Sequence, residues 1–410
     1  MERKVYFDNN ATTPIRREVY EKMIPFLTEH FGNPSSVHWA GRKVHQAIEE
    51  ARNNIARLLN CTDREIVFTA GGSESDNHAI KGTFFAFKNK GRHIITTKVE
   101  HPAVLETVKD LKKFGAEVTF LGVDEFGELD LNELEKAIRP DTILVTIMYA
   151  NNETGVIFPI KEITRIVKRK NPETIVHTDA VQVAGKEKID VIDLGVDLLS
   201  ISGHKLYAPK GVGALYIKKG LRIDRLISGG HQERNRRAGT ENVASIVAFG
   251  EAARLAIDEI EEEKKRLQYL RDKLENGILE RIPYVKLNGH KTHRLCNTTN
   301  LSFKYVEGEG ILLSLDMVGI AASSGSACTS GSLDPSHVLL AMGLDHETAH
   351  GSVRLSLGRF NTEEEVDYML QELPPIIERL RSMSPLYNRR PDEPEPFRVE
   401  NCETHHHGEE

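Results

Sequence analysis

Short runs of β-branched and apolar residues alternate with amphipathic segments over about the first 258 residues of the 410-residue chain. The runs that predict strands lie at residues 65–69, 93–97, 117–121, 142–148 and 174–177. Between them, apolar positions recur with helical spacing at residues 102–114, 131–138 and 160–170. Because strands that alternate with helices usually form βαβ units, this pattern predicts an α/β domain in which helices cover a mainly parallel sheet.

The pattern changes beyond this region. A charge-rich helix is predicted over about residues 243–279 and would join the first region to the rest of the chain. After it, strand and helix patterns alternate at residues 300–303, 309–317, 336–342, 352–357 and 362–381, which predicts a smaller α+β domain. We expect a large domain over residues 13–258, a small domain made of residues 1–12 and 259–388, and a disordered, proline-rich tail over residues 389–410.

Charge and cysteine content exclude several classes of protein. The chain has 54 lysines and arginines against 61 aspartates and glutamates, a formal net charge of -7, which argues against a nucleic-acid interface. Its apolar stretches are too short to cross a bilayer, and its first residues lack an apolar signal core. Four widely spaced cysteines suit neither a disulfide framework nor a zinc module. We therefore expect a cytoplasmic protein with no nucleic-acid or membrane partner.

Two polar residues follow apolar runs that predict strands. Asp179 closes the run at residues 174–177, and Lys205 follows the run at residues 196–201. In a parallel sheet, residues at such positions meet at the carboxyl edge, where binding sites collect. A lysine that holds the aldehyde of pyridoxal phosphate (PLP) and an aspartate that keeps its pyridine nitrogen protonated are what an enzyme using this coenzyme needs. Taken singly, each has a plainer alternative as a turn residue or a solvated charge.

A glycine-rich turn offers a phosphate site. Residues 68–75 run from a predicted strand through Gly71 and Gly72 into a helix that begins near Ser73. Glycine lets the backbone approach a phosphate closely, and the amides and positive dipole at a helix start favour an anion. Gly72 and Ser73 are therefore candidate phosphate contacts. The alternative is an ordinary strand-to-helix turn with a serine cap.

Three further polar residues fall at the same predicted edge of the sheet. His101 ends a strand just before Pro102, where its ring can stack on a flat coenzyme and move protons, unless it is merely structural. Asn152 lies in the loop of residues 150–155, and Gln182 follows three positions after Asp179. Their amides can hydrogen-bond a ring oxygen or a substrate carboxylate, although turns and surfaces also contain such residues.

Cys328 lies in the most distinctive stretch, residues 321–332, which consists largely of small residues. Small residues cannot bury enough surface to make a segment rigid, so we expect a mobile, accessible loop. A thiol in such a loop is a candidate nucleophile. A buried, inert cysteine is the alternative, and it suits Cys61 and Cys296.

Cationic and metal-ligating residues complete the candidates. Arg354 lies within an apolar strand, where its fork of donors suits a substrate carboxylate or a structural ion pair. The cationic loop of residues 231–240 could meet a phosphate across a subunit boundary, although solvent exposure alone would also explain it. Cys402 and the histidines at 405–407 offer metal ligands, but a flexible trio rarely makes a selective site.

In this order, the polar segments resemble the motifs of the cysteine desulfurases of the class V aminotransferase group. The segments are residues 8–13, 32–36, 100–104, 151–155, 177–182, 202–205 and 354–357. The resemblance covers about residues 3–385. Residues 229–233 and 326–332 look most like the nitrogen-fixation branch, with the housekeeping iron-sulfur branch close behind. The phosphate turn at residues 71–73 departs slightly, because many relatives have Ala-Thr or Gly-Thr there.

The resemblance implies the type I PLP fold, with a mainly parallel seven-stranded sheet between helices, in a homodimer with active sites at the subunit interface. Lys205 would bind the coenzyme aldehyde, Asp179 the pyridine nitrogen, and His101 would stack on the ring. The ring oxygen would contact Asn152 and Gln182. The phosphate would contact Gly72, Ser73, Ser202, Gly203, His204 and, from the neighbouring chain, Thr240. The substrate carboxylate would contact Asn33, Asn152 and Arg354.

The implied activity is removal of sulfur from L-cysteine, which gives L-alanine and a persulfide on Cys328 that passes to an iron-sulfur scaffold protein. Cys328 would also be a transient ligand of the cluster iron, and His101 would take the proton of its thiol. Within PLP enzymes, the rivals are a selenocysteine lyase and an ordinary aminotransferase, which has no need of Cys328. Outside enzymes, the rival is a sulfur or metal carrier, which has no use for Lys205.

Overall fold

The computed structural model describes residues 3–324 and 335–388. One sheet has the strand order β2 (Ile66–Thr69), β8 (Gly213–Ile217), β7 (Leu198–Ser202), β6 (Ile175–Asp179), β5 (Thr142–Thr146), β3 (His93–Thr97) and β4 (Glu117–Leu121). Its strands pair in parallel except β8, which runs antiparallel to both neighbours. The predicted mainly parallel sheet is confirmed, whereas β8 is a strand that the sequence pattern did not predict.

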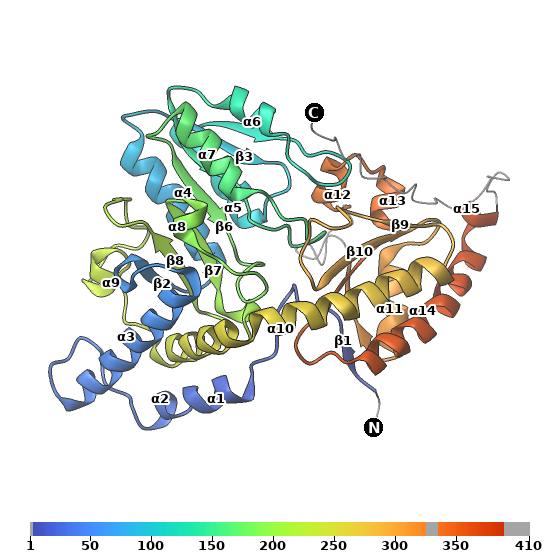
Figure 1. Ribbon diagram of the computed structural model, residues 1–410, viewed down its shortest axis with the longest axis horizontal. Helices are drawn as coiled ribbons and strands as arrows, with labels where there is room; N and C mark the ends of the chain where they lie inside the picture. The colour runs from blue at the N-terminus through green and yellow to red at the C-terminus, as the bar shows by residue number, and fades with distance from the viewer. Residues whose placement is uncertain (1–2, 325–334, 389–410) are drawn as a thin grey trace, which may run out of the picture.

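Helices cover both faces of this sheet (Figure 1), and successive side chains of its central strands pack in two different cores. Ile94 and Leu144 face a core made with α4 (Gly72–Phe87) and α5 (Pro102–Leu111). Their neighbours Ile95 and Val145 face a core made with α3 (Trp39–Leu59), α7 (Ile160–Lys170) and the start of the long helix α10 (Val243–Arg281). Because both faces are covered, the strands are buried on both sides, which explains their continuous apolar runs.

The long helix α10 (Val243–Arg281) joins the two parts of the chain (Figure 1). Its 39 residues make it about 58 Å long. Ile246 and Phe249 near its start pack in the core of the large sheet, and Leu270 and Leu274 near its end pack in a second core. The joining helix predicted from the charge pattern is therefore present.

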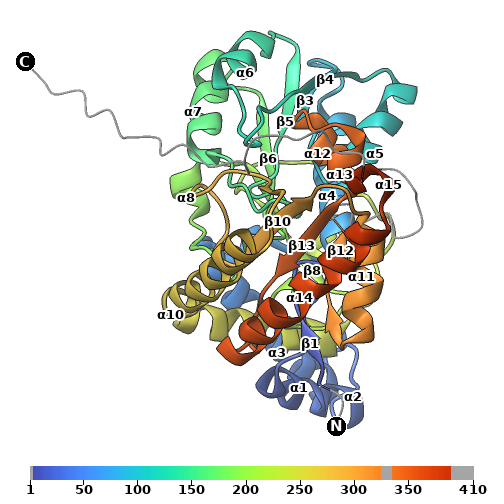
Figure 2. The same cartoon turned by 90° about the vertical axis from the view of Figure 1, so that its right-hand side faces the viewer.

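The second core lies against a smaller sheet, with the strand order β12 (Ser323–Ser324), β13 (Ser352–Ser356), β10 (Thr298–Phe303) and β9 (Val285–Leu287). Figure 2 shows α11 (Gly308–Met317) and α14 (Glu363–Met383) across this sheet. β1 (Val5–Tyr6) pairs in parallel with β11 (Ile320–Ala321), which brings the N-terminal residues to this part. The smaller α+β unit is thus present, while its boundaries at residues 12 and 258 stay a prediction.

The other helices are short. They are α1 (Arg17–Met23), α2 (Pro25–Thr28), α6 (Leu131–Ala137), α8 (Val191–Leu194), α9 (Gln232–Asn235), α12 (His337–Ala341), α13 (His346–His350) and α15 (Pro385–Asn388). Val338 and Leu339 of α12 pack in the core of the large sheet, although they follow the small sheet's first strands in sequence. The two parts therefore share contacts beyond α10. The predicted tail at residues 389–410 lies outside the described residues.

A buried ion pair holds the loop of residues 229–240 against β2. Arg52 donates through both terminal nitrogens to Glu233 at 2.7 and 2.8 Å, and Glu233 accepts the backbone N–H of Phe68 at 2.8 Å. Glu233 and Arg234 have φ angles of 46° and 56°, a left-handed backbone that costs free energy in residues with a Cβ. The ion pair therefore fixes a strained part of this loop.

We predict that Arg52→Met lowers the free energy of unfolding by about 3–5 kcal/mol, because it leaves the Glu233 carboxylate buried without its partner. Urea denaturation followed by circular dichroism measures the loss. The double variant Arg52→Met with Glu233→Met removes both charges and should recover most of it. An Arg52→Met protein within about 1 kcal/mol of wild type would contradict this account.

Candidate active site

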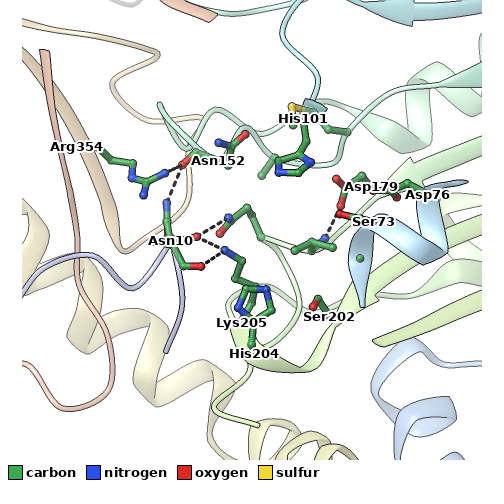
Figure 3. Close-up of a pocket in the computed structure, with 16 residues that line it drawn as sticks. Asn10, Ser73, Asp76, His101, Asn152, Asp179, Ser202, His204, Lys205 and Arg354 are labelled. Carbon is green, nitrogen blue, oxygen red and sulfur yellow. Dashed lines mark hydrogen bonds between the residues drawn. The ribbon is translucent and has the colours of Figure 1, made fainter. Parts of the chain in front are cut away.

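A cavity of about 260 Å³ lies at the carboxyl edge of the large sheet (Figure 3). Asp179 is the last residue of β6, Lys205 ends the 3-10 turn Gly203–Lys205 that follows β7, and His101 is the residue before α5. They meet because parallel strands bring their carboxyl ends to one edge. Arg354 reaches the same cavity from β13 of the small sheet. The cavity is therefore built by both parts of the chain.

Most of the predicted site residues line this cavity. They are Gly72, Ser73, His101, Asn152, Asp179, Gln182, Ser202, His204, Lys205 and Arg354. Gly203 is absent from the lining, and a Cβ added to it would come within 2.7 Å of Val212, so it lets the turn pack closely. Asn33 and Thr240 are exposed and do not line the cavity of their own chain. Their ligand contacts stay predictions, and Cys328 lies outside the described residues.

The start of α4 forms a cradle beside the cavity. Gly71 has a φ angle of 154°, which residues with a Cβ rarely adopt. A Cβ added to Gly72 would lie 2.8 Å from a side-chain carbon of Val181. Glycine is therefore required by the close packing of the turn. The first N–H groups of a helix lack intrahelical acceptors and lie at the positive end of its dipole, so Gly72 and Ser73 suit an anion such as a phosphate.

Two buried carboxyls lie side by side in the cavity (Figure 3). Burial raises the pKa of Asp179 to about 6, against the opposing effects of a hydrogen bond from the Val181 N–H and the charge of Lys205. Burial, and then the charge of Asp179, raises the pKa of Asp76 well above its usual range. Burial and the neighbouring charge thus favour the protonated form of Asp76, and Asp179 is the carboxyl of the two that is suited to pair, when ionised, with a protonated ring nitrogen.

Lys205 presents its amine to the cavity. Its Nζ donates to the backbone carbonyl oxygens of Asn10 and Ala11, the latter at 2.6 Å. Gln182 Nε2 also donates to the Asn10 carbonyl, at 3.0 Å. The N-terminal segment thus fixes the position of the lysine that would bind an aldehyde.

His101 is neutral at physiological pH. Burial, and then the charge of Lys205, lowers the pKa of His101 to about 4. Its Nδ1 accepts the backbone N–H of Ala103 at 3.1 Å, so the neutral ring carries its proton on Nε2. The imidazole can therefore stack on a flat ring and donate a hydrogen bond from Nε2. In this tautomer, it is less suited to accept the proton of a thiol.

Arg354 is both buried and paired. Its side chain is 1% exposed, its Nη1 donates to the Asn152 carbonyl at 2.9 Å, and its Nη2 donates to Asp8 Oδ1 at 2.8 Å. The sequence left open whether Arg354 forms a structural ion pair or binds a substrate carboxylate. The structure contains the ion pair, and other N–H groups of the guanidinium remain to bind a substrate carboxylate.

The cavity also contains residues to which the sequence assigned no role. They are Asn10, Ala11, Asp76, Met148, Ala150 and Val181. Asp76 follows Ser73 by three positions on α4, so helical spacing from the phosphate turn could have indicated it. Asn10 and Ala11 belong to the motif of residues 8–13, but only the tertiary structure brings that segment to Lys205.

The described residues that flank the Cys328 segment contact the cavity wall. Before the segment, Ser323 pairs with Arg354 in the small sheet. After it, Ser336 hydrogen-bonds Glu153, and His337 Nε2 lies 3.0 Å from the Glu100 carbonyl oxygen, next to His101. The chain therefore enters and leaves the segment beside the site.

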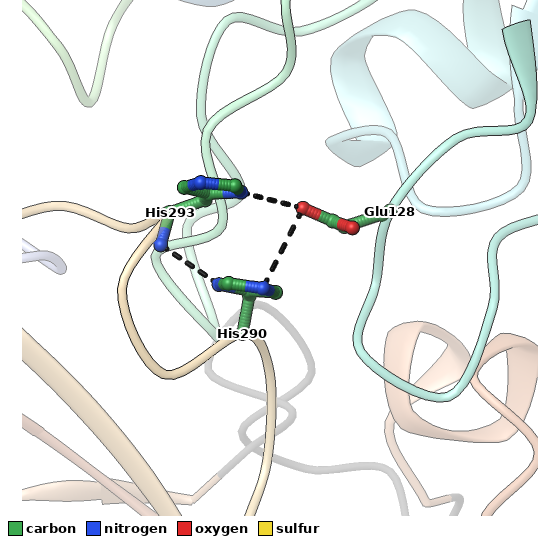
Figure 4. Close-up of side chains that lie close together, drawn as sticks. All are labelled: Glu128, His290 and His293. Atoms are coloured by element: carbon green, nitrogen blue, oxygen red, sulfur yellow. Dashed lines mark hydrogen bonds and ion pairs between the residues drawn. The ribbon is translucent and has the colours of Figure 1, made fainter. Parts of the chain in front are cut away.

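One group of three possible metal ligands occurs among the described residues, formed by Glu128, His290 and His293 (Figure 4). The two imidazoles are stacked, with centroids 4.2 Å apart and planes 8° from parallel. A metal lies in the plane of each ligating ring, and stacked rings share no plane. In addition, His290 Nδ1 accepts the His293 backbone N–H at 2.8 Å, whereas a ligating histidine usually donates from its second nitrogen. The group therefore suits a contact between two loops better than a metal site.

Within residues 3–324 and 335–388, every helix is too short or too polar to cross a bilayer.

Comparisons with known proteins agree on one family. Residues 5–369 match the family described as aminotransferase class-V. The chain is 56% identical over 382 residues to cysteine desulfurase IscS of Methanosarcina thermophila, covering 93% of this chain and 94% of the relative. It is 54% identical over 388 residues to cysteine desulfurase 2 of Trichormus variabilis, covering 95% and 96%. A solved structure titled NifS-like protein matches with a TM-score of 0.87 and 43% identity, over 92% of this chain and all of its own.

The carboxyl beside His101 gives a pH prediction. Glu100 accepts hydrogen bonds from Thr97 and from the Met148 N–H, yet burial raises the pKa of Glu100 to about 8. The folded state therefore holds a proton that the unfolded state loses from about pH 4.5, and the wild type loses stability as pH rises toward 8.

Glu100→Gln removes this titration. Thermal unfolding at pH 5 and pH 8 should show the Tm of the variant, relative to wild type, rising with pH. A difference in Tm that is the same at both pH values would show that Glu100 is not held protonated.

Proposed function

The chain belongs to the class V aminotransferase family and is a PLP-dependent cysteine desulfurase, and we propose that its reaction takes place in the cavity at the carboxyl edge of the large sheet. The family identified from the sequence motifs is confirmed by these matches. The observation that carries the assignment of the site is that an amine, a buried carboxyl and a helix start meet in one cavity. Lys205, Asp179 and Ser73 supply them.

These residues fit the coenzyme. Lys205 would hold its aldehyde, Asp179 its ring nitrogen, and the N–H groups of Gly72 and Ser73 its phosphate. Asn152 and Gln182 line the same cavity and would contact the ring oxygen, while Ser202 and His204 would join the phosphate contacts. When bound, PLP supplies an electron-poor ring that stabilises negative charge at the substrate Cα.

The protein residues would orient the substrate and move its protons. Arg354, held next to Asn152, would bind the carboxylate of L-cysteine and so fix the position of Cα. The Lys205 amine would take the Cα proton, because it is the basic group at the centre of the cavity. Lys205, protonated by that step, would return a proton to the product carbon, and His101 would donate a hydrogen bond from Nε2 to the groups bound in the cavity.

Cys328 would receive the sulfur. Its thiolate attacks the substrate sulfur, the S–S bond forms as the Cβ–S bond breaks, and the bonding electron pair stays with the carbon skeleton, which is protonated to alanine. L-cysteine and the thiol together give L-alanine and the persulfide, so no external oxidant or reductant is required. The proposal is supported by the flanking contacts of Ser323 and His337, which begin and end this segment at the cavity.

A second copy of the chain would complete the site. Asn33 lies in the loop before α3, and this loop and the first residue of α3 carry strongly exposed apolar side chains, Phe31 at 80%, Val37 at 88% and Trp39 at 74%. An exposed apolar patch of this kind marks an interface. A homodimer would cover it, and Asn33 and Thr240 would then reach ligands of the neighbouring chain.

The destination of the sulfur is part of the proposal. We propose that an iron-sulfur scaffold protein accepts it, that Cys328 transiently ligates cluster iron during transfer, and that the enzyme is cytoplasmic. Cysteines without a disulfide framework suit a reducing compartment. We also propose that the enzyme belongs to the nitrogen-fixation branch of the family. This assignment is based on the resemblance of residues 229–233 and 326–332 to that branch.

We predict that Cys328→Ala keeps the yellow coenzyme but loses alanine and sulfide release from L-cysteine by about 100-fold or more, because the sulfur has no acceptor. Cys61→Ala is the matched control and should retain both. Mass spectrometry of the wild type after brief exposure to cysteine should find one additional sulfur atom on Cys328. Equal alanine release by Cys328→Ala and wild type would exclude the persulfide step and favour an ordinary aminotransferase.

A further inference from the structure

Asp8 contacts the guanidinium that we propose binds the substrate carboxylate. Arg354 is 1% exposed, and its Nη2 donates to Asp8 Oδ1 at 2.8 Å, while the Asp8 side chain is 18% exposed. Among the residues that the structure describes, Arg354 Nε has no hydrogen-bond partner. The arginine therefore meets any incoming carboxylate with part of its charge already balanced.

The backbone holds Asp8 firmly in this position. Asp8 forms an isolated parallel bridge with Ser356 on β13, the strand that carries Arg354. The following residues extend the contact, because Asn9 N donates to the Ser356 carbonyl at 3.1 Å and Asn10 N donates to the Ser356 hydroxyl at 2.9 Å. Asp8 is thus a counter-ion whose backbone is held against β13, the strand that carries Arg354, and its contact with Arg354 is fixed by the fold.

The substrate and the product carry the same carboxylate. L-cysteine must bind, but L-alanine must leave, and a guanidinium in a buried site with no counter-ion would hold both tightly. Binding of this uniform kind lowers KM without raising kcat and slows product release. A second carboxylate beside the arginine opposes the charge of the ligand and weakens the binding of both.

We infer that Asp8 is a positioning residue that orients Arg354 and sets its affinity for amino-acid carboxylates, which keeps the alanine product from being retained. This inference rests on the proposed role of Arg354. Asp8 would act through hydrogen-bond geometry and through charge, and the two effects can be separated by substitution.

Asp8→Asn keeps an oxygen that accepts from Arg354 Nη2 but removes the charge. With the coenzyme-loaded enzyme, isothermal titration calorimetry should find that L-alanine binds about 3–30-fold more tightly, as expected for loss of one nearby like charge at a largely buried site. Steady-state kinetics should show KM for L-cysteine lower by a similar factor, stronger inhibition by alanine, and no increase in kcat.

Matched variants separate charge from geometry. Asp8→Ala removes both the charge and the acceptor, so Arg354 is no longer oriented, and its alanine affinity should be weaker than that of Asp8→Asn. Asp110→Asn removes an exposed charge on α5 that pairs with Lys113, and it should leave alanine affinity unchanged. Asp8→Ser provides the uncharged comparison should the asparagine variant not fold.

Arg354→Gln distinguishes the failure of this inference from the failure of the proposed site. If Arg354→Gln weakens alanine binding at least about 10-fold while Asp8→Asn binds alanine no more tightly than wild type, the role of Asp8 is wrong and that of Arg354 stands. If Arg354→Gln leaves alanine binding unchanged, Arg354 does not hold the carboxylate, and the inference falls with it. Tighter binding in Asp8→Asn together with weaker binding in Arg354→Gln supports both.

Discussion

The site depends on one constraint, which is that an ionised carboxylate and an amine must coexist in a cavity whose carboxyl side chains are buried. Asp179 and Lys205 meet there because β6 and β7 are parallel neighbours, and Asp179 lies opposite Ser200 in their register. Burial disfavours charged side chains, and it shifts the neighbouring groups toward their neutral forms. It raises the pKa of Asp76 and lowers the pKa of His101. The remaining charges are then available for a zwitterionic coenzyme and substrate.

The N-terminal segment contacts residues from both parts of the chain where they meet at the cavity. Asn10 and Ala11 hold the amine of Lys205 through backbone carbonyls, and Asp8 holds Arg354. One short segment thus places both the group that would bind the coenzyme and the group that would bind the substrate. A shift of this segment against the large sheet would move Lys205 and Arg354 at the same time. The packing of the segment on β13 is therefore needed to hold both residues in position for the reaction.

The sequence allowed much of this to be predicted, for a physical reason. Strands such as β3 and β5 are buried on both faces, so they appear as continuous apolar runs, and the polar residues that follow them mark the edge of the sheet. Strands of two or three residues, such as β1 and β9, have no periodicity to detect and exist because tertiary contacts hold them. Asp8 and Asp76 gained roles only in the structure, since the sequence does not reveal which buried group faces another. The exposure of Asn33 could not be foreseen from its motif.

The central claim is that Lys205, which follows β7 and lines the same cavity as Asp179, is the residue that holds the coenzyme. The most direct test is reduction of the purified yellow protein with borohydride, followed by proteolysis and mass spectrometry of the lysine-containing peptides. The account predicts a reduced pyridoxyl phosphate group on the peptide that contains Lys205. A coenzyme fixed to another lysine, or a protein that carries no coenzyme at all, would contradict it.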